Sequence, residues 1–205
     1  KILSFVPYGD GIDPVCSRNI RIENCFFRCS DDCIAVKAMR GGPNVSGITV
    51  QDCIMAGYNF SDGFTIGYEA VTDVIEDITV KNCDILYARG GTKAGQHSAF
   101  SIICDGPATI RKVTFEDIRV EENITRMFEL NVTDGNFYSQ ARPGRIQGVR
   151  LKNISWEKAC PILITGHNAE HMVEDVVFEG CRVAGAPLSA AQIQTNAFIR
   201  RVVIR

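Results

Sequence analysis

A short pattern recurs along the whole chain and constrains its fold more than any other feature. The pattern is an apolar residue, any residue, an apolar residue, any residue, then Asn, Asp or Gly, and last Cys or Ile. Successive copies are 28, 30, 35, 36, 27 and 26 residues apart. They start at Ile20, Ile48, Ile78, Val113, Val149, Val176 and Val202. A period in this range indicates a stack of similar units, each of which needs its neighbours to bury its apolar side.

Each unit is built from β-strands. Apolar and polar residues alternate with a period of two, and the apolar positions are mostly β-branched or aromatic. A second strand-like segment follows the first in five units, at Cys33–Val36, Gly63–Ile66, Ala99–Ile102, Met127–Leu130 and Pro161–Ile164. Strands stacked about 4.8 Å apart would close one core. The sequence therefore predicts an all-β fold, a right-handed parallel β-helix of about seven coils, with residues 1–205 as a single domain.

Both ends of the chain fall within the repeat. Ile2–Val6 reads as a strand, and the seventh copy is cut off at Arg205. Solenoids need end caps with a polar outer face. We therefore expect this chain to be a segment of a longer β-helix, with at least one coil and a cap preceding Lys1.

The last position of the repeat predicts a ladder of small apolar side chains inside the helix. Free cysteine packs as a small hydrophobic residue. The nine cysteines are an odd number, and none of them shows the paired spacing of a zinc site. Disulfides between neighbouring coils are the alternative, although side chains in a stacked ladder point in parallel rather than at each other. The ladder comprises Cys25, Cys53, Cys83, Ile118, Ile154 and Cys181.

Composition excludes some classes of partner. The chain has 22 basic and 24 acidic residues and a formal net charge of −2. This balance gives no reason to expect a nucleic acid or an anionic membrane as partner. No apolar run approaches the roughly 20 residues that cross a bilayer. We expect no cofactor, and the sequence does not indicate an oligomeric state.

Acidic residues recur at one corner of the predicted coils. When the second strands are aligned on Ile12, Ile34 and their equivalents, the position two residues upstream reads Asp10, Asp32, Asp62, Ser98 and Arg126. Asp31 lies beside this column. Neighbouring members would be about 5 Å apart at the backbone, and like charges at that spacing raise at least one pKa. Two other interpretations stay open, an Asp ladder that caps turns and a Ca²⁺ site.

Converging carboxylates fit the cleavage of glycosidic bonds. An inverting glycosidase uses a protonated carboxyl as acid and a carboxylate as base, roughly 6.5–9.5 Å apart with water between them. Repulsion between the carboxylates supplies the raised pKa that the acid needs. Carboxylates on successive coils can offer such separations.

The segment that carries these residues resembles a known catalytic region. Asp10-Gly-Ile-Asp13, followed by the run Ser30–Lys37, is similar to the catalytic region of polygalacturonase-type glycoside hydrolases and their dextranase and isopullulanase relatives. In those families an Asp precedes an Asp-Asp pair by about twenty residues, and here Asp10 precedes Asp31 by 21. The resemblance implies that Asp31 is the general acid and that Asp10 and Asp32 activate water. It also implies a carbohydrate substrate and a secreted or periplasmic location.

Three motifs depart from the polygalacturonase pattern. Asn-Thr-Asp is replaced by Tyr8-Gly9-Asp10, and Gly-His-Gly by Ser61-Asp62-Gly63. The Arg-Ile-Lys motif, which grips the substrate carboxylate in polygalacturonases, falls on Ser101-Ile102-Ile103. A galacturonate site without that pair would lose its charge-assisted contacts. The departures favour a neutral or otherwise different glycan over pectin.

Further polar residues are candidates for sugar binding, and two other functions remain in competition. The non-catalytic alternative is a glycan-binding β-helix, such as a spike or an adhesin segment, which would bind without releasing reducing ends. An epimerase or lyase on the same scaffold would need basic residues near a uronate, and the column offers few. The candidate substrate-binding residues are Asp62, Tyr68, Glu69, Arg89, Lys93, His97 and Arg126.

Overall fold

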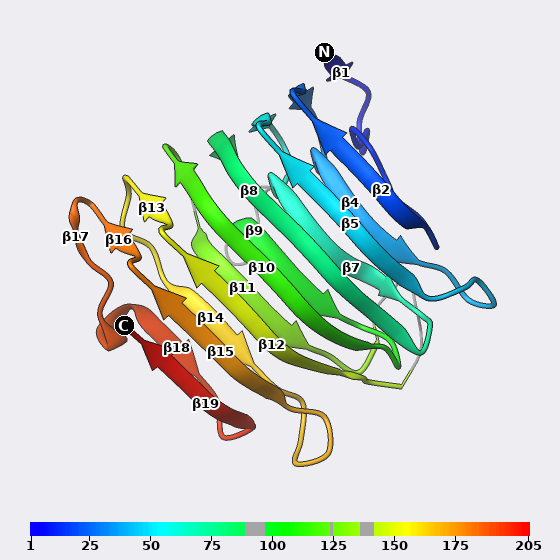
Figure 1. Ribbon diagram of the computed structural model, residues 1–205, viewed down its shortest axis with the longest axis vertical. Coiled ribbons are helices and arrows are strands. Elements are labelled where there is room, and N and C mark those ends of the chain that lie inside the picture. Colours follow the sequence, from blue (N-terminus) through cyan, green and yellow to red (C-terminus); the bar gives the residue numbers. More distant parts are fainter. Residues whose placement is uncertain (89–96, 124, 136–141) are drawn as a thin grey trace.

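The computed structural model describes residues 1–88, 97–123, 125–135 and 142–205. The chain winds as a parallel β-helix whose strands stack side by side from the N-terminal to the C-terminal end (Figure 1). The described strands form a 13-stranded and a six-stranded sheet, and all pairs are parallel except β16 with β17. A single turn of 3₁₀ helix, Ala190–Gln192, is the only helix in these ranges. The predicted all-β, parallel architecture is confirmed.

The two sheets form different faces of the coils. The six-stranded sheet contains β4 (Ile34–Ala38), β7 (Phe64–Ala70), β9 (Ser98–Cys104), β11 (Arg126–Val132), β14 (Ile162–Thr165) and β18 (Ile193–Thr195). The 13-stranded sheet contains β1 (Ile2–Ser4), β2 (Arg18–Glu23), β3 (Phe26–Cys29), β5 (Val45–Gln51), β6 (Ile54–Gly57), β8 (Val74–Ala88), β10 (Thr109–Val120), β12 (Arg145–Lys152), β13 (Ser155–Trp156), β15 (Val173–Glu179), β16 (Arg182–Val183), β17 (Ala186–Pro187) and β19 (Ile199–Ile204).

The Asn, Asp or Gly position of the repeat is a corner of the coil, between two strands in four coils and inside the continuous strands β8 and β10 in the other two. The six residues there have φ between 47° and 63°, the left-handed region that Gly, Asn and Asp adopt most readily. Their side chains also bond from coil to coil, as Asn82 Nδ2 donates to Asp52 Oδ1 at 2.6 Å. A local backbone requirement thus explains why this position is restricted to three residue types. The corner residues are Asn24, Asp52, Asn82, Asp117, Asn153 and Gly180.

Strand register confirms the alignment on which the acidic column was based. Ile12 forms a bridge with Ile34, and Ile34 pairs with Phe64. Phe64 pairs with Phe100, which in turn pairs with Phe128. The positions two residues upstream therefore lie on successive coils at the same corner.

The cysteine ladder forms inside the helix. Cys83 pairs with Ile118, and the strands on either side continue the same register. All nine cysteines are free thiols. Cys53, Cys83 and Cys181 are buried, but Cys25 is only half-buried. The prediction of full burial is wrong for Cys25, because β2, the strand that leads into it, pairs with β5 alone and has no strand on its other side.

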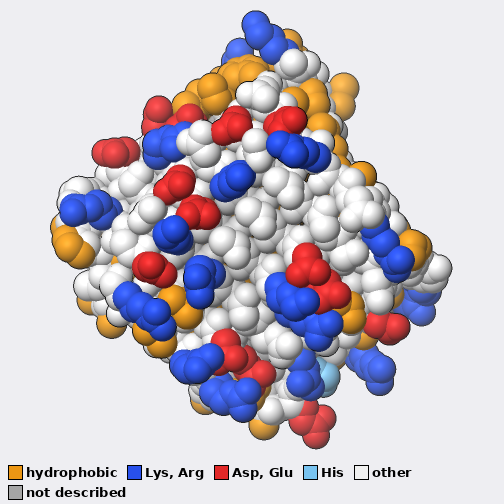
Figure 2. Space-filling model, viewed as in Figure 1, with side chains coloured by type: hydrophobic (Ala, Val, Ile, Leu, Met, Phe, Trp, Pro, Cys, Tyr) orange, Lys and Arg blue, Asp and Glu red, His pale blue; other side chains and the backbone are white. Residues whose placement is uncertain are grey.

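The outer surface carries charges of both signs. Figure 2 shows basic and acidic side chains interspersed over one face of the molecule. Several ion pairs join neighbouring coils, including Arg111 with Glu76 at 2.8 Å and Lys152 with Glu116 at 2.6 Å. Within the described ranges, no helix is long and apolar enough to cross a membrane.

Candidate active site

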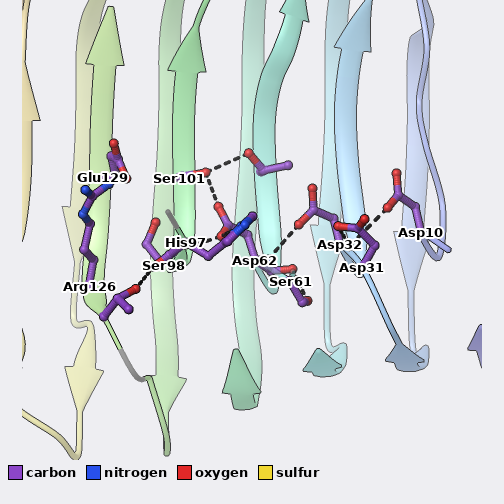
Figure 3. A network of polar contacts seen from close by, with 12 residues as sticks. Asp10, Asp31, Asp32, Ser61, Asp62, His97, Ser98, Ser101, Arg126 and Glu129 are labelled. Carbon is purple, nitrogen blue, oxygen red and sulfur yellow. Dashed lines mark hydrogen bonds and ion pairs between the residues drawn. The ribbon is translucent and has the colours of Figure 1, made fainter. Parts of the chain in front are cut away.

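The acidic column forms a hydrogen-bonded ladder at the corner before β4, β7 and β9 (Figure 3). Asp10 Oδ1 accepts the backbone N–H of Asp32 at 3.2 Å, and Asp32 Oδ1 accepts that of Asp62 at 2.7 Å. Asp62 Oδ1 continues the ladder by accepting the N–H of Ser98 at 2.9 Å. Each carboxylate therefore caps the next coil, which fixes its position and offsets part of the repulsion between neighbours.

Asp31 lies beside the ladder and faces an open cavity. Its Oδ1 accepts the backbone N–H of Asp32 at 3.0 Å. Burial and then the charge of Asp10 raise the pKa of Asp31 from its ordinary 3.8 to about 6. Asp31 can therefore hold a proton in weakly acidic solution while remaining accessible from the cavity.

Asp32 and Asp62 are the most enclosed members of the group. Asp32 is 7% exposed and Asp62 is fully buried. Burial, followed by the charges of Asp62 and Asp31, raises the pKa of Asp32 well above its ordinary value. Asp62 Oδ2 accepts a hydrogen bond from the Ser101 hydroxyl, which also lies 2.7 Å from the hydroxyl of Thr65. The deep carboxylates are thus held by partners from the neighbouring strands.

A lysine that was not among the predicted site residues binds two of the acids. Lys37 Nζ lies 2.8 Å from Asp10 Oδ2 and 2.8 Å from Asp13 Oδ2. Burial lowers the pKa of Lys37, but the hydrogen bonds to the two carboxylates outweigh burial and raise the pKa above its ordinary value. The sequence feature that could have identified Lys37 as a site residue is its outward-facing position, three residues after the core residue Ile34.

An imidazole reaches the site from the following coil. His97 Nδ1 lies 3.4 Å from Asp62 Oδ1 without the alignment of a hydrogen bond. Burial lowers the pKa of His97, but the neighbouring Asp62 raises it more, so the pKa is above its ordinary value. The Ser61–Gly63 motif departs from Gly-His-Gly and lacks the histidine. His97, 35 residues after Asp62, nevertheless lies beside this motif.

The cavity over these groups has a volume of about 610 Å³, within the range typical of small-molecule sites. The structure brings most of the predicted residues together here. Asp62 lies beneath the cavity, whereas Arg126 does not line it and forms an ion pair with Glu129. Arg89 and Lys93 lie outside the described residues. The lining consists of Tyr8, Asp10, Asp31, Asp32, Lys37, Phe60, Tyr68, Glu69 and His97.

Three aromatic residues shape the cavity, of which only Tyr68 was predicted. Burial raises the pKa of Tyr68 above its ordinary value, so its hydroxyl keeps its proton. Tyr8 and Phe60 stack with ring centroids 5.4 Å apart and both are exposed. No repeat position signals Tyr8 or Phe60, because both lie in irregular segments before the strands.

The candidate catalytic carboxylates lie close together. One oxygen from each of Asp10, Asp31 and Asp32 falls within 4.8 Å of the others, a nearest-atom separation below the 6.5–9.5 Å expected between the carboxyl groups of an inverting glycosidase. The reason is the ladder, since each column carboxylate reaches toward the backbone of the next coil.

Two overlapping groups of side chains in this site could hold a metal ion. Asp10, Asp31 and Asp32 form one group, and Asp32, Asp62 and His97 form the other, each with ligand atoms within 4.8 Å. Backbone N–H groups already occupy one oxygen of each of these four carboxylates. These backbone hydrogen bonds by themselves account for the positions of the four carboxylates.

A parallel β-helix with clustered carboxylates that line a cavity fits the class expected from the sequence, a glycan-cleaving β-helix protein. The comparisons with known proteins agree with this class. The family model of glycosyl hydrolases family 28 matches residues 6–197, and the chain belongs to that family.

Several relatives carry polygalacturonase names. A probable polygalacturonase of Arabidopsis thaliana is 30% identical over 115 residues, which cover 56% of this chain and 23% of that protein. An exopolygalacturonase of Cochliobolus carbonum is 31% identical over 123 residues, covering 55% of this chain and 26% of the relative. The chain thus spans about a quarter of the length of these relatives.

A solved structure has the same fold. The family 28 exopolygalacturonase of Yersinia enterocolitica matches 96% of this chain and 38% of its own, with a TM-score of 0.59. Sequence identity is 16%, so this likeness concerns the fold alone.

Proposed function

We propose that this chain carries the catalytic site of an inverting glycoside hydrolase that cleaves a bond in a poly- or oligosaccharide. The observation that carries the proposal is the cavity-facing Asp31, whose pKa is raised to about 6. Membership of glycosyl hydrolases family 28 supports the reaction type.

Asp31 serves as the general acid. Its protonated carboxyl donates to the glycosidic oxygen as the bond to the anomeric carbon breaks, and the leaving sugar departs as an alcohol. Burial and the charge of Asp10 keep the proton on Asp31 until it is needed. Asp31 emerges as a carboxylate and is reprotonated from solvent.

Asp10 and Asp32 hold and activate the attacking water. Their oxygens lie within 4.8 Å of each other, and two acceptors that share one water are about 4.5 Å apart when each hydrogen bond is about 2.8 Å long. Water attacks the anomeric carbon as its proton passes to Asp10, while Asp32, whose pKa burial and the neighbouring acids raise well above its ordinary value, positions the water. Lys37, at 2.8 Å from Asp10, balances the negative charge on the basic side of the site.

A non-catalytic glycan-binding β-helix is the main competing function. Such a protein needs hydrogen bonds and aromatic surface, and it gains nothing from a protonated carboxyl beside two other acids. Buried like charges are costly and concentrate where chemistry uses them. The carboxylate cluster therefore favours hydrolysis over binding alone.

Asp31→Asn tests the proposal, because it keeps the side-chain shape and removes the acidic proton. Release of reducing ends from the glycan that the parent cleaves should fall by about 10² or more, while binding of that glycan persists. Asp52→Asn is the matched control, since Asp52 occupies an exposed corner where neighbouring coils carry Asn. An Asp31→Asn variant as fast as the parent would refute the assignment, and retained anomeric configuration in the first product would refute inversion.

A further inference from the structure

We propose that the cavity takes an uncharged sugar and that Glu69 is a specificity-determining residue that accepts a hydrogen bond from one of the sugar hydroxyls. This inference rests on the proposed hydrolase function and names the substrate class of the same site. It follows from the balance of charge around the cavity and from one buried oxygen.

The cavity wall is acidic, and its basic groups are already engaged. Among the described lining residues, only Lys37 and His97 are basic, against four carboxyl side chains. Lys37 Nζ is held by Asp10 and Asp13 at 2.8 Å each, and His97 faces Asp62. A sugar carboxylate would enter among like charges with no unengaged cation from these lining residues to receive it.

The strand next to the cavity floor adds no positive charge. Ser101 and Ile103 are outward-facing positions of β9, and both are buried. Ser101 donates its hydroxyl to Asp62, and Ile103 is apolar. A uronate therefore finds no charge-assisted hydrogen bond at these two positions.

Glu69 provides a hydrogen-bond acceptor that lacks a donor, which suits a sugar hydroxyl rather than a sugar carboxylate. Glu69 lines the cavity, and its buried Oε2 has no hydrogen-bond partner among the described residues, so a sugar reaches this oxygen when the carboxylate turns toward the cavity. A buried acceptor without a donor is unfavourable, and a hydroxyl donor relieves that cost. A sugar hydroxyl supplies that donor, whereas a carboxylate supplies only more acceptors and a second negative charge.

The aromatic pair at the cavity fits the same class of ligand. Tyr8 and Phe60 stack with an interplanar angle of 21° and present an exposed apolar surface. Aromatic faces bind well to the apolar C–H faces of neutral sugar rings. Stacking on this pair would hold a sugar ring, and Glu69 together with the acidic wall would select the neutral one.

The test uses oligosaccharides in matched pairs that differ only in the sugar carboxylate. Oligogalacturonides are compared with their carboxyl-reduced counterparts, and other uronic-acid oligosaccharides with the corresponding neutral ones. The parent protein should release reducing ends at least about tenfold faster from the neutral member of the pair it cleaves. Glu69→Gln, which removes the charge and keeps an acceptor, should shift the neutral-to-acidic rate ratio toward the acid by about tenfold. Glu157→Gln, at an exposed position outside the cavity, should leave the ratio unchanged.

The outcomes separate this inference from the proposed function. Faster cleavage of the acidic member, abolished by Asp31→Asn, would overturn the neutral-sugar inference and leave the hydrolase standing. A ratio that Glu69→Gln does not move would overturn the role of Glu69. Cleavage of no member by the parent protein would count against both proposals.

Discussion

The raised pKa of Asp31 makes a quantitative prediction about stability. The folded protein binds a proton at Asp31 with a pKa of about 6, while the unfolded chain has the ordinary value of 3.8. The folded state is therefore favoured by this group at low pH, and the advantage is lost as pH rises from about 4 to about 6. Asp31→Asn removes this titration, so the variant should gain stability relative to the parent over that window.

The magnitude follows from the size of the shift. At 1.36 kcal/mol per pKa unit, a change from 3.8 to about 6 corresponds to about 3 kcal/mol. Asp31 is half-buried, and screening by solvent reduces this to about 1–2 kcal/mol. The difference in unfolding free energy between variant and parent should therefore increase by about 1–2 kcal/mol between pH 4 and pH 7.

Denaturant unfolding followed by circular dichroism, at constant ionic strength and in steps of one pH unit, measures this difference. Any pH-independent effect of the substitution cancels in the comparison across pH. Asp52→Asn, an equivalent substitution at an exposed corner outside the cavity, is measured alongside as the control. A flat difference for Asp31→Asn, or one that decreases toward pH 7, would show that Asp31 is not held in the protonated form.

Three further predictions test the site and the fold. The value of kcat/KM should fall about tenfold per pH unit above about pH 6 as Asp31 loses its proton, and a profile that stays level to pH 8 would contradict its role as acid. Thiol titration under denaturing, non-reducing conditions should find all nine cysteines free, and two or more disulfides would overturn the ladder. Gly67→Ala should destabilise by at least about 2 kcal/mol, because a Cβ there would lie 1.8 Å from the Ile103 carbonyl oxygen at φ +107°. Gly41→Ala, at φ +79° with open space around it, should cost only about 1 kcal/mol in urea unfolding, and equal costs for the two variants would contradict the packing at Gly67.

The repeat determined the architecture without any structure. Alternation with a period of two identifies strands, and the recurring Asn, Asp or Gly marks a left-handed corner that only a few residue types adopt easily. Stacked coils must keep their apolar positions in register, so alignment of Ile34 with Phe64 and Phe100 also aligned the residues two positions upstream. The convergence of Asp10, Asp32 and Asp62 was therefore predictable from spacing alone.

Tertiary structure decided what those carboxylates contact. Lys37 between Asp10 and Asp13, and His97 beside Asp62, depend on how side chains leave the strands and on the path of the chain between coils. Neither property is periodic, so the repeat carries no information about them. The short separation of the acids arose in the same way, because backbone N–H groups of one coil draw in the carboxylates of the coil before it. Sequence spacing specifies which coils are neighbours, whereas burial and hydrogen bonding specify the charge that each group carries.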